Sequence, residues 1–225
     1  MTLLRRVGTS VGNTLSAGLT SLNARHPWSH NDHFHSWILA NMPQPCDLAL
    51  DVGCGQGELV AALAPHARRV IGTDVDAEMR EQAVQRCGGL PNVSIVGDDW
   101  TTIEGGFDLL TMVAVLHHLD VAEALRSVRL RLKPGGRFLA VGLAPPRTAQ
   151  DHAWDVASII TNPVIGFVKH PRPSRTDRLT SPPFPIRDPN LSFEDLQQLL
   201  DQFMPGAILR HRLGFRHTIA WTHPG

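Results

Sequence analysis

A glycine-rich segment, Asp51-Val52-Gly53-Cys54-Gly55-Gln56-Gly57-Glu58, constrains the fold of this chain more than any other feature. It follows a short apolar run at residues 48–52 and precedes a helical pattern at 58–64. Glycines allow a tight turn and let a ligand approach the main chain. The first turn of a helix presents N–H groups that have no partner within the helix. A strand, a glycine turn and a helix in this order predict the beginning of an α/β fold with a ligand at the turn.

Strand and helix patterns alternate after this segment. The predicted strands cover 69–73, 92–96, 107–114 and 137–143, and the predicted helices run from Asp76 to Arg86 and from Asp120 to Leu132, ending before Lys133-Pro134-Gly135-Gly136. Strands separated by helices predict a Rossmann-like, doubly wound, mostly parallel sheet with helices on its faces. Residues 98–106 are too short for a crossover helix and predict a loop or a single turn.

The last part of the chain predicts one more helix and an antiparallel hairpin. Ser192 is a suitable N-cap, and Pro205-Gly206 ends the apolar stripe that follows it. Residues 207–213 and 216–222 predict two strands that form a C-terminal antiparallel hairpin at the sheet edge. At 225 residues the chain is predicted to be a single domain.

The charges around the glycine turn favour a cationic ligand over a pyrophosphate. The spacing is GxGxG, and Glu58 stands where a dinucleotide fold has its third glycine. Asp51 adds a second negative charge, so the turn suits an amino or sulfonium group. Asp74 follows the second strand and can accept both hydroxyls of a ribose.

The segment after the third strand contains Asp98, Asp99 and Trp100. Either carboxylate can accept a hydrogen bond from an exocyclic amine, and the indole can cover an adenine ring. The alternative is ordinary turn chemistry, because aspartate favours turns.

Composition excludes several classes of protein. Lys and Arg number 21 and Asp and Glu number 21, and a net charge of zero argues against a nucleic-acid partner. The three cysteines are widely spaced, which favours a reducing compartment and a cytoplasmic location over a disulfide framework. No uncharged run is apolar and long enough to predict a membrane span.

As an ordered set, these segments resemble class I S-adenosylmethionine-dependent methyltransferases, in particular the small-molecule, type 11-like group. The resemblance rests on residues 50–57, on Val70-Ile71-Gly72-Thr73-Asp74, on Val96-Gly97-Asp98, on 107–110 with 115–119, and on 132–136. It implies S-adenosyl-L-methionine as cofactor and S-adenosyl-L-homocysteine as product.

The resemblance also implies roles for individual residues. Gly53, Gly55 and nearby backbone, with Gly57 in the same turn, would hold the methionine part above Asp51. Asp74 would bind the ribose, Val75 the adenine and Asp98 or Asp99 its amine, while Val113 would border the cofactor.

Two histidines follow the fourth strand, where the resemblance places the acceptor. His117 and His118 are candidate bases, because histidine titrates near neutral pH. The alternative is that a histidine packs beneath the next helix.

The resemblance implies an N-terminal lid segment, residues 1–46, before a cofactor-binding domain at 47–225, in which an insertion at 144–190 shapes the acceptor pocket. His26, Trp28, His30, Asn31 and His33 are candidates to close the pocket. No carboxylate or cysteine pattern completes a metal site there, so we predict no metal. A polar helix start before Trp37 is the alternative.

These patterns together predict methyl transfer to oxygen or nitrogen of a small-molecule acceptor by a monomer or homodimer. The alternatives are another enzyme on the same fold and a non-catalytic binding module with weak membrane-surface contact through residues 1–24. A nicotinamide oxidoreductase is disfavoured by Glu58 and the glycine spacing.

Overall fold

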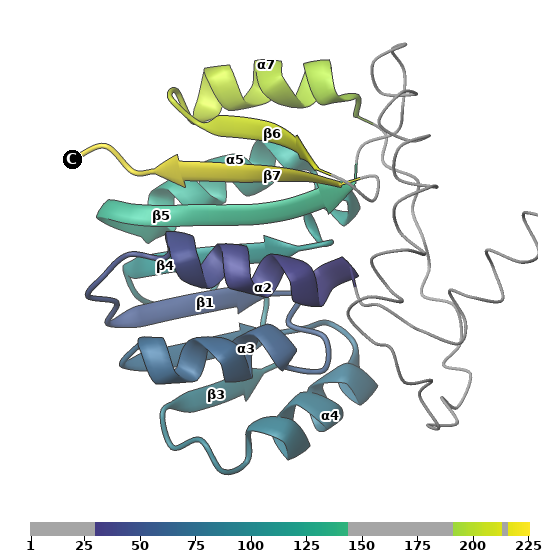
Figure 1. Ribbon diagram of the computed structural model, residues 1–225, viewed down its shortest axis with the longest axis vertical. Helices are drawn as coiled ribbons and strands as arrows, with labels where there is room; N and C mark the ends of the chain where they lie inside the picture. Colours follow the sequence, from purple (N-terminus) through teal and green to yellow (C-terminus); the bar gives the residue numbers. More distant parts are fainter. Residues whose placement is uncertain (1–29, 144–190, 213–215) are drawn as a thin grey trace, which may run out of the picture. The chain divides into compact units, whose positions relative to one another are not determined.

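Seven strands form one sheet within the residues that the computed structural model describes, 30–143, 191–212 and 216–225 (Figure 1). The strands are β1 Leu48–Val52, β2 Arg69–Thr73, β3 Val93–Val96, β4 Phe107–Val113, β5 Leu132–Leu143, β6 Ile208–Arg212 and β7 Arg216–Thr222. Their order is β3-β2-β1-β4-β5-β7-β6. Strands β1 to β5 are parallel, and β7 is antiparallel to both β5 and β6. The predicted doubly wound sheet and its C-terminal hairpin are confirmed.

Helices cover both faces of this sheet. They are α2 His30–Asn41, α3 Glu58–Leu63, α4 Ala77–Cys87, α5 Val121–Arg131 and α7 Phe193–Phe203, with short 3-10 turns η1 Ala64–His66 and η2 Leu116–His118. Buried side chains of α2, α3 and α4 share one apolar cluster, and those of α5 and α7 share the other. Neighbouring residues of β1 enter different clusters, Ala49 on one side and Leu50 on the other, as alternation along a strand requires.

Three helices begin at the predicted caps. The Asp76 carboxylate accepts the N–H groups of Glu78 and Met79, and the Asp120 carboxylate accepts that of Glu123. Ser192 and Asp195 form a reciprocal capping box. These local hydrogen bonds satisfy backbone donors that a helix cannot pair internally, which is why the sequence predicts these starts well.

The fifth strand differs from its prediction at its start. The helix ends at Arg131, and Leu132 already pairs with Phe107, whereas the prediction began the strand at Arg137. The register shifts between Phe107 and Leu109, so residues 133–136 bulge from the ladder. Gly135 makes this possible with a φ of +80°, and its N–H donates to the carbonyl of His223.

The stretch between β3 and β4 contains a turn, as predicted. The N–H of Thr102 donates to the carbonyl of Asp99 at 2.8 Å. No helix lies between these two strands in the described chain.

Helix α2 is part of the packed core. Phe34, Ile38 and Met42 recur every fourth residue and are buried in the same cluster as α3. The predicted lid segment therefore includes a helix that packs on the sheet, and residues 1–29 lie outside the described chain.

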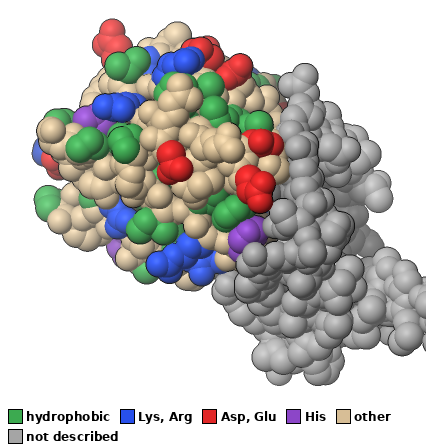
Figure 2. Space-filling model, turned by 90° about the horizontal axis from the view of Figure 1, so that it is seen from above, with side chains coloured by type: hydrophobic (Ala, Val, Ile, Leu, Met, Phe, Trp, Pro, Cys, Tyr) green, Lys and Arg blue, Asp and Glu red, His purple; other side chains and the backbone are tan. Residues whose placement is uncertain are grey.

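Charged side chains of both signs are interspersed on the face seen in Figure 2, which views the molecule from the α7 end. This mixture agrees with the balanced charge of the sequence. None of the described helices is both long and apolar enough to span a membrane.

Replacing Leu200 by alanine is expected to destabilise the fold by about 2–5 kcal/mol, since its side chain is fully buried between α7 and the sheet. Urea unfolding followed by circular dichroism measures the change. Leu130→Ala is the matched control, because Leu130 is 86% exposed on α5 and its loss should cost less than about 0.5 kcal/mol. Equal midpoints for the two variants would show that α7 does not contribute to the core.

Candidate functional site

The glycine turn lies at the carboxyl end of β1, where the sheet changes its direction of winding. Strand β1 pairs with β2 on one side and with β4 on the other. The chain first adds β2 and β3 outward on one side of β1, and then adds β4 and β5 outward on the other side. Loops diverge at such a point and leave a crevice outside the carboxyl ends of the strands. We refer to this end of the sheet as the carboxyl edge.

Backbone hydrogen bonds attach the turn to the end of β2. The N–H groups of Gly53 and Cys54 donate to the carbonyl of Thr73 at 2.7 and 2.9 Å. The N–H of Gly55 donates to the Asp74 carboxylate at 2.8 Å. These three amides therefore bind groups of the protein and do not form a site for a phosphate.

The three glycines serve different purposes, although all have positive φ. A Cβ on Gly53 would lie 2.1 Å from Cγ2 of Val115, and one on Gly57 would lie 3.0 Å from Cβ of Ala83. A Cβ on Gly55 would meet no atom within 4 Å. Gly53 and Gly57 thus permit close packing of the protein itself, and Gly55 is the position at which a ligand can approach the backbone.

Asp51 is a buried carboxylate beneath this turn, with 2% of its surface exposed. The Thr111 hydroxyl donates to its Oδ1 at 2.6 Å. Burial raises the pKa of Asp51 to about 7; the Thr111 hydrogen bond opposes this rise, and the nearby charge of Asp74 adds to it. A cation placed here would lower this pKa, because an opposite charge nearby favours the ionised carboxylate.

Asp74 connects the turn to the start of α4. Its Oδ2 accepts the Gly55 N–H, and its Oδ1 accepts the Asp76 N–H at 2.9 Å. Each carboxylate oxygen has a second lone pair, so both can still accept a hydroxyl. Val75 follows with 96% of its surface exposed.

The candidates after β3 lie in three different environments. The Thr73 hydroxyl donates to the carbonyl of Asp98 at 2.9 Å, and the Asp98 carboxylate, which is exposed, accepts no hydrogen bond from the described residues. Asp99 accepts the Thr101 N–H at 2.9 Å, and this hydrogen bond lowers its pKa. Trp100 is 9% exposed and packs in the core with Leu50.

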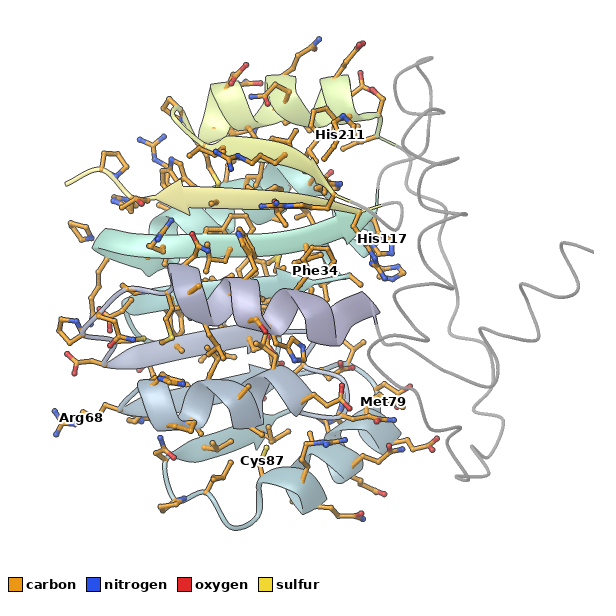
Figure 3. The ribbon with its side chains drawn as sticks, in the orientation of Figure 1. Phe34, Arg68, Met79, Cys87, His117 and His211 are labelled. Carbon is orange, nitrogen blue, oxygen red and sulfur yellow. The ribbon has the colours of Figure 1, made fainter. Side chains whose placement is uncertain are left out.

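The two histidines lie in η2, directly beyond β4. Val113 ends the strand, and Ala114 turns the chain with a φ of +59° while its N–H donates to the carbonyl of Val141 at 2.7 Å. The rings of His117 and His118 are 4.0 Å apart. Figure 3 shows His117 at the carboxyl edge and Arg68 at the opposite end of the sheet.

His117 is only partly accessible, and its Nδ1 is buried without a hydrogen-bond partner. Burial, with smaller contributions from His118 and Arg216, lowers its pKa to about 4. His117 is therefore neutral at physiological pH. His118 is exposed.

The N-terminal candidates lie at the limit of the described chain. His26 and Trp28 fall outside it, and His30, Asn31 and His33 begin α2, where only the backbone is described. The described side chains bring no group of three potential metal ligands together. The closing role predicted for these residues stays a prediction.

Sequence reasoning missed Thr111, Arg216 and His217. Thr111 is the single hydroxyl residue within the apolar run of β4, and Arg216 and His217 precede the apolar centre of β7, Ile219-Ala220-Trp221. Polar residues at buried strand positions were the available signal. Their partners lie far away in the sequence, so the pattern alone could not pair them.

A family model and a curated relative both describe methyltransferases. Residues 50–138 match the family described as a methyltransferase domain. An uncharacterized methyltransferase of Mycobacterium bovis is 29% identical over 206 residues, covering 88% of this chain and 98% of the relative. Nodulation protein S of Rhizobium tropici is 31% identical over 120 residues, which cover 51% of this chain and 50% of that relative.

A solved structure supports the fold. The N-methyltransferase NodS from Bradyrhizobium japonicum, in complex with S-adenosyl-L-homocysteine, has a TM-score of 0.57 at 17% identity and covers 92% of this chain and 98% of that one. At this identity the likeness concerns the fold alone. The matched domain, the related methyltransferase and the strand order together support a class I S-adenosylmethionine-dependent methyltransferase.

Proposed function

We propose that this protein transfers the methyl group of S-adenosyl-L-methionine to an oxygen or nitrogen of a small-molecule acceptor. The observation that carries the proposal is the buried Asp51 carboxylate, which has no cationic partner among the described residues and lies below a turn that opens at Gly55. A cofactor with an ammonium group fits this environment, and a pyrophosphate does not.

The residues of the turn suit the parts of the cofactor in order along the carboxyl edge. Asp51 would attract the amino group, and the backbone at Gly53 and Gly55 would lie against the methionine part. The remaining lone pairs of Asp74 would accept the ribose hydroxyls, and exposed Val75 would pack on the adenine. When bound, the cofactor supplies a methyl group on a positively charged sulfur.

Asp98 is the better candidate for the adenine amine. The Asp99 carboxylate accepts a hydrogen bond from Thr101 within its own turn, and the Asp98 carboxylate is exposed. Trp100 is accounted for by core packing, and Gly57 by the contact of α3 with α4. Val113, at the end of β4, would border the cofactor through its backbone.

The acceptor would lie beside η2. Exposed His118 accepts a hydrogen bond from the O–H or N–H of the acceptor and so orients the lone pair of the acceptor atom toward the methyl group. As the methyl group transfers, His118 takes that proton and passes it to water, and neutral His117 lies beside it, 4.0 Å away between ring centres. The protein therefore aligns the acceptor and removes its proton.

Calorimetry with S-adenosyl-L-homocysteine tests the proposal directly. Binding in the micromolar range is expected for a cofactor product, and no heat of binding at millimolar ligand would end the proposal.

The pH dependence of this binding tests the role of Asp51. Below pH 7 the carboxyl becomes protonated and no longer attracts an ammonium group, so affinity should fall as the pH falls. With a pKa of about 7, binding at pH 5.5 should be about 20-fold weaker than at pH 7.5, and binding at pH 6.5 should release a proton. Asp51→Asn should lose this dependence, and Asp99→Asn should retain it. A wild-type affinity that is constant from pH 5.5 to 7.5 contradicts the assignment.

Changing His118 to alanine should lower kcat about 10²–10⁴-fold for an acceptor that must lose a proton, with S-adenosyl-L-homocysteine affinity unchanged. The assay follows formation of S-adenosyl-L-homocysteine with the hydroxyl or amine compound that turns over in a panel. His66→Ala is the control, because His66 is exposed in η1, between β1 and β2. Undiminished kcat in both His117→Ala and His118→Ala would remove these residues from the reaction.

A further inference from the structure

Basic side chains from three elements meet at the carboxyl edge beyond the proposed cofactor site. Arg216 and His217 open β7, where His217 pairs with Gly142 of β5 and with His211 of β6. His117 of η2 lies within electrostatic range of both, since Arg216 affects the pKa of His117 and His117 affects that of His217. We call His117, Arg216 and His217 the basic cluster.

The hydrogen-bonding groups of the basic cluster are buried without partners. His217 is 3% exposed, and neither of its ring nitrogens has a hydrogen bond. Nε and Nη1 of Arg216 and Nδ1 of His117 are likewise buried and unpaired. Buried polar groups are nearly always hydrogen-bonded in folded proteins. Several unpaired nitrogens at one edge of the sheet therefore indicate a place where a ligand supplies the missing hydrogen-bond partners.

A glycine in the neighbouring strand makes room for the His217 ring. A Cβ on Gly142 would lie 2.4 Å from Nε2 of His217. On the other side, Phe193 of α7 stacks on His211 at 3.7 Å and meets His217 edge-on at 6.4 Å between ring centres. Figure 3 shows His211 toward the same end of the sheet as His117. Packing therefore fixes the imidazole of His217 in place.

No carboxylate balances the cluster among the described residues. Burial lowers the pKa of His217 to about 3, and every other contribution comes from His211, Arg216 and His117. Burial alone lowers the pKa of Arg216. The neighbouring Arg212 adds a further positive charge, and its Nε donates to the Thr218 hydroxyl at 3.1 Å. A largely buried guanidinium without an anion is costly, and an anion at this place would be strongly favoured.

Resting on the methyl transfer proposed above, we infer that the acceptor carries an oxyanion, a carboxylate or phosphate, which binds Arg216 with His117 and His217 alongside. The planar guanidinium matches the two oxygens of such a group. Asp51 and Asp74 make the cofactor end of the edge negative, so an anionic acceptor enters with its charged group directed away from the cofactor. The basic cluster thereby sets both the substrate class and its orientation.

The test uses three compounds of similar shape: benzoate, phenyl phosphate and benzamide. Each is titrated into the full-length protein saturated with S-adenosyl-L-homocysteine, with affinity measured by calorimetry and imidazole signals followed by NMR. At least one anion is expected to bind and to shift the ring signals of His117 and His217, and neutral benzamide is not. A response to benzoate alone indicates a carboxylate, and a response to phenyl phosphate alone indicates a phosphate.

Variants assign the binding to one side chain. Arg216→Gln should weaken anion binding about 10- to 100-fold, the loss of one charge-assisted interaction, and Arg216→Lys should restore part of it. Arg210→Gln is the matched control, since Arg210 is an exposed arginine of β6 in the same hairpin. With an acidic acceptor that turns over, Arg216→Gln should raise KM far more than it lowers kcat.

Equal binding of benzamide and the anions overturns the inference, as does anion binding that is unchanged in Arg216→Gln. The wild-type NMR titration decides the matter even where a variant does not fold, because absent shifts at His117 and His217 overturn it as well. These outcomes are separate from the proposed function, which fails if S-adenosyl-L-homocysteine does not bind.

Discussion

The hydrogen bond from Thr111 to Asp51 joins the two strands at which the sheet reverses its winding. Thr111 lies on β4 and Asp51 on β1, and both are buried. The bond holds a carboxylate in the interior beneath the glycine turn, between apolar clusters on the two faces of the sheet. The glycine turn, Asp74 and η2 are all positioned relative to this pair of strands.

The carboxyl edge is divided electrostatically into two halves. Asp51 and Asp74 occupy one half, and Arg216 carries the positive charge of the basic cluster in the other. This division would direct a positively charged cofactor to one half of the edge and a negatively charged acceptor to the other, independently of the shape of each ligand. Opposite charges at one edge would let a chain with no net charge attract two ligands of opposite sign.

The sequence predicted those features that depend on neighbours along the chain. Helix starts at Asp76, Asp120 and Ser192 follow from local capping, and the alternation of strands and helices gives the sheet. The predicted start of β5 was five residues too late. Leu132 pairs with Phe107 although residues 133–136, which follow it, carry a turn signal.

The candidate site was predictable only in part. The turn and the acidic residues after β1 and β2 stand next to strand ends that the pattern reveals. The Thr111–Asp51 bond spans 60 residues, and the approach of Arg216 to His117 spans still more of the chain. Such pairings depend on strand order and register, which no local pattern contains.

Gly142 and His217 form a pair in which each residue determines what the other can be. The imidazole occupies the volume that any side chain at position 142 would need. In related chains, an aromatic or imidazole ring at position 217 should accompany glycine at position 142. Where the ring at 217 is lost, a larger residue should be permitted at 142. Co-variation of these two positions would therefore trace where in the family this acceptor site arose.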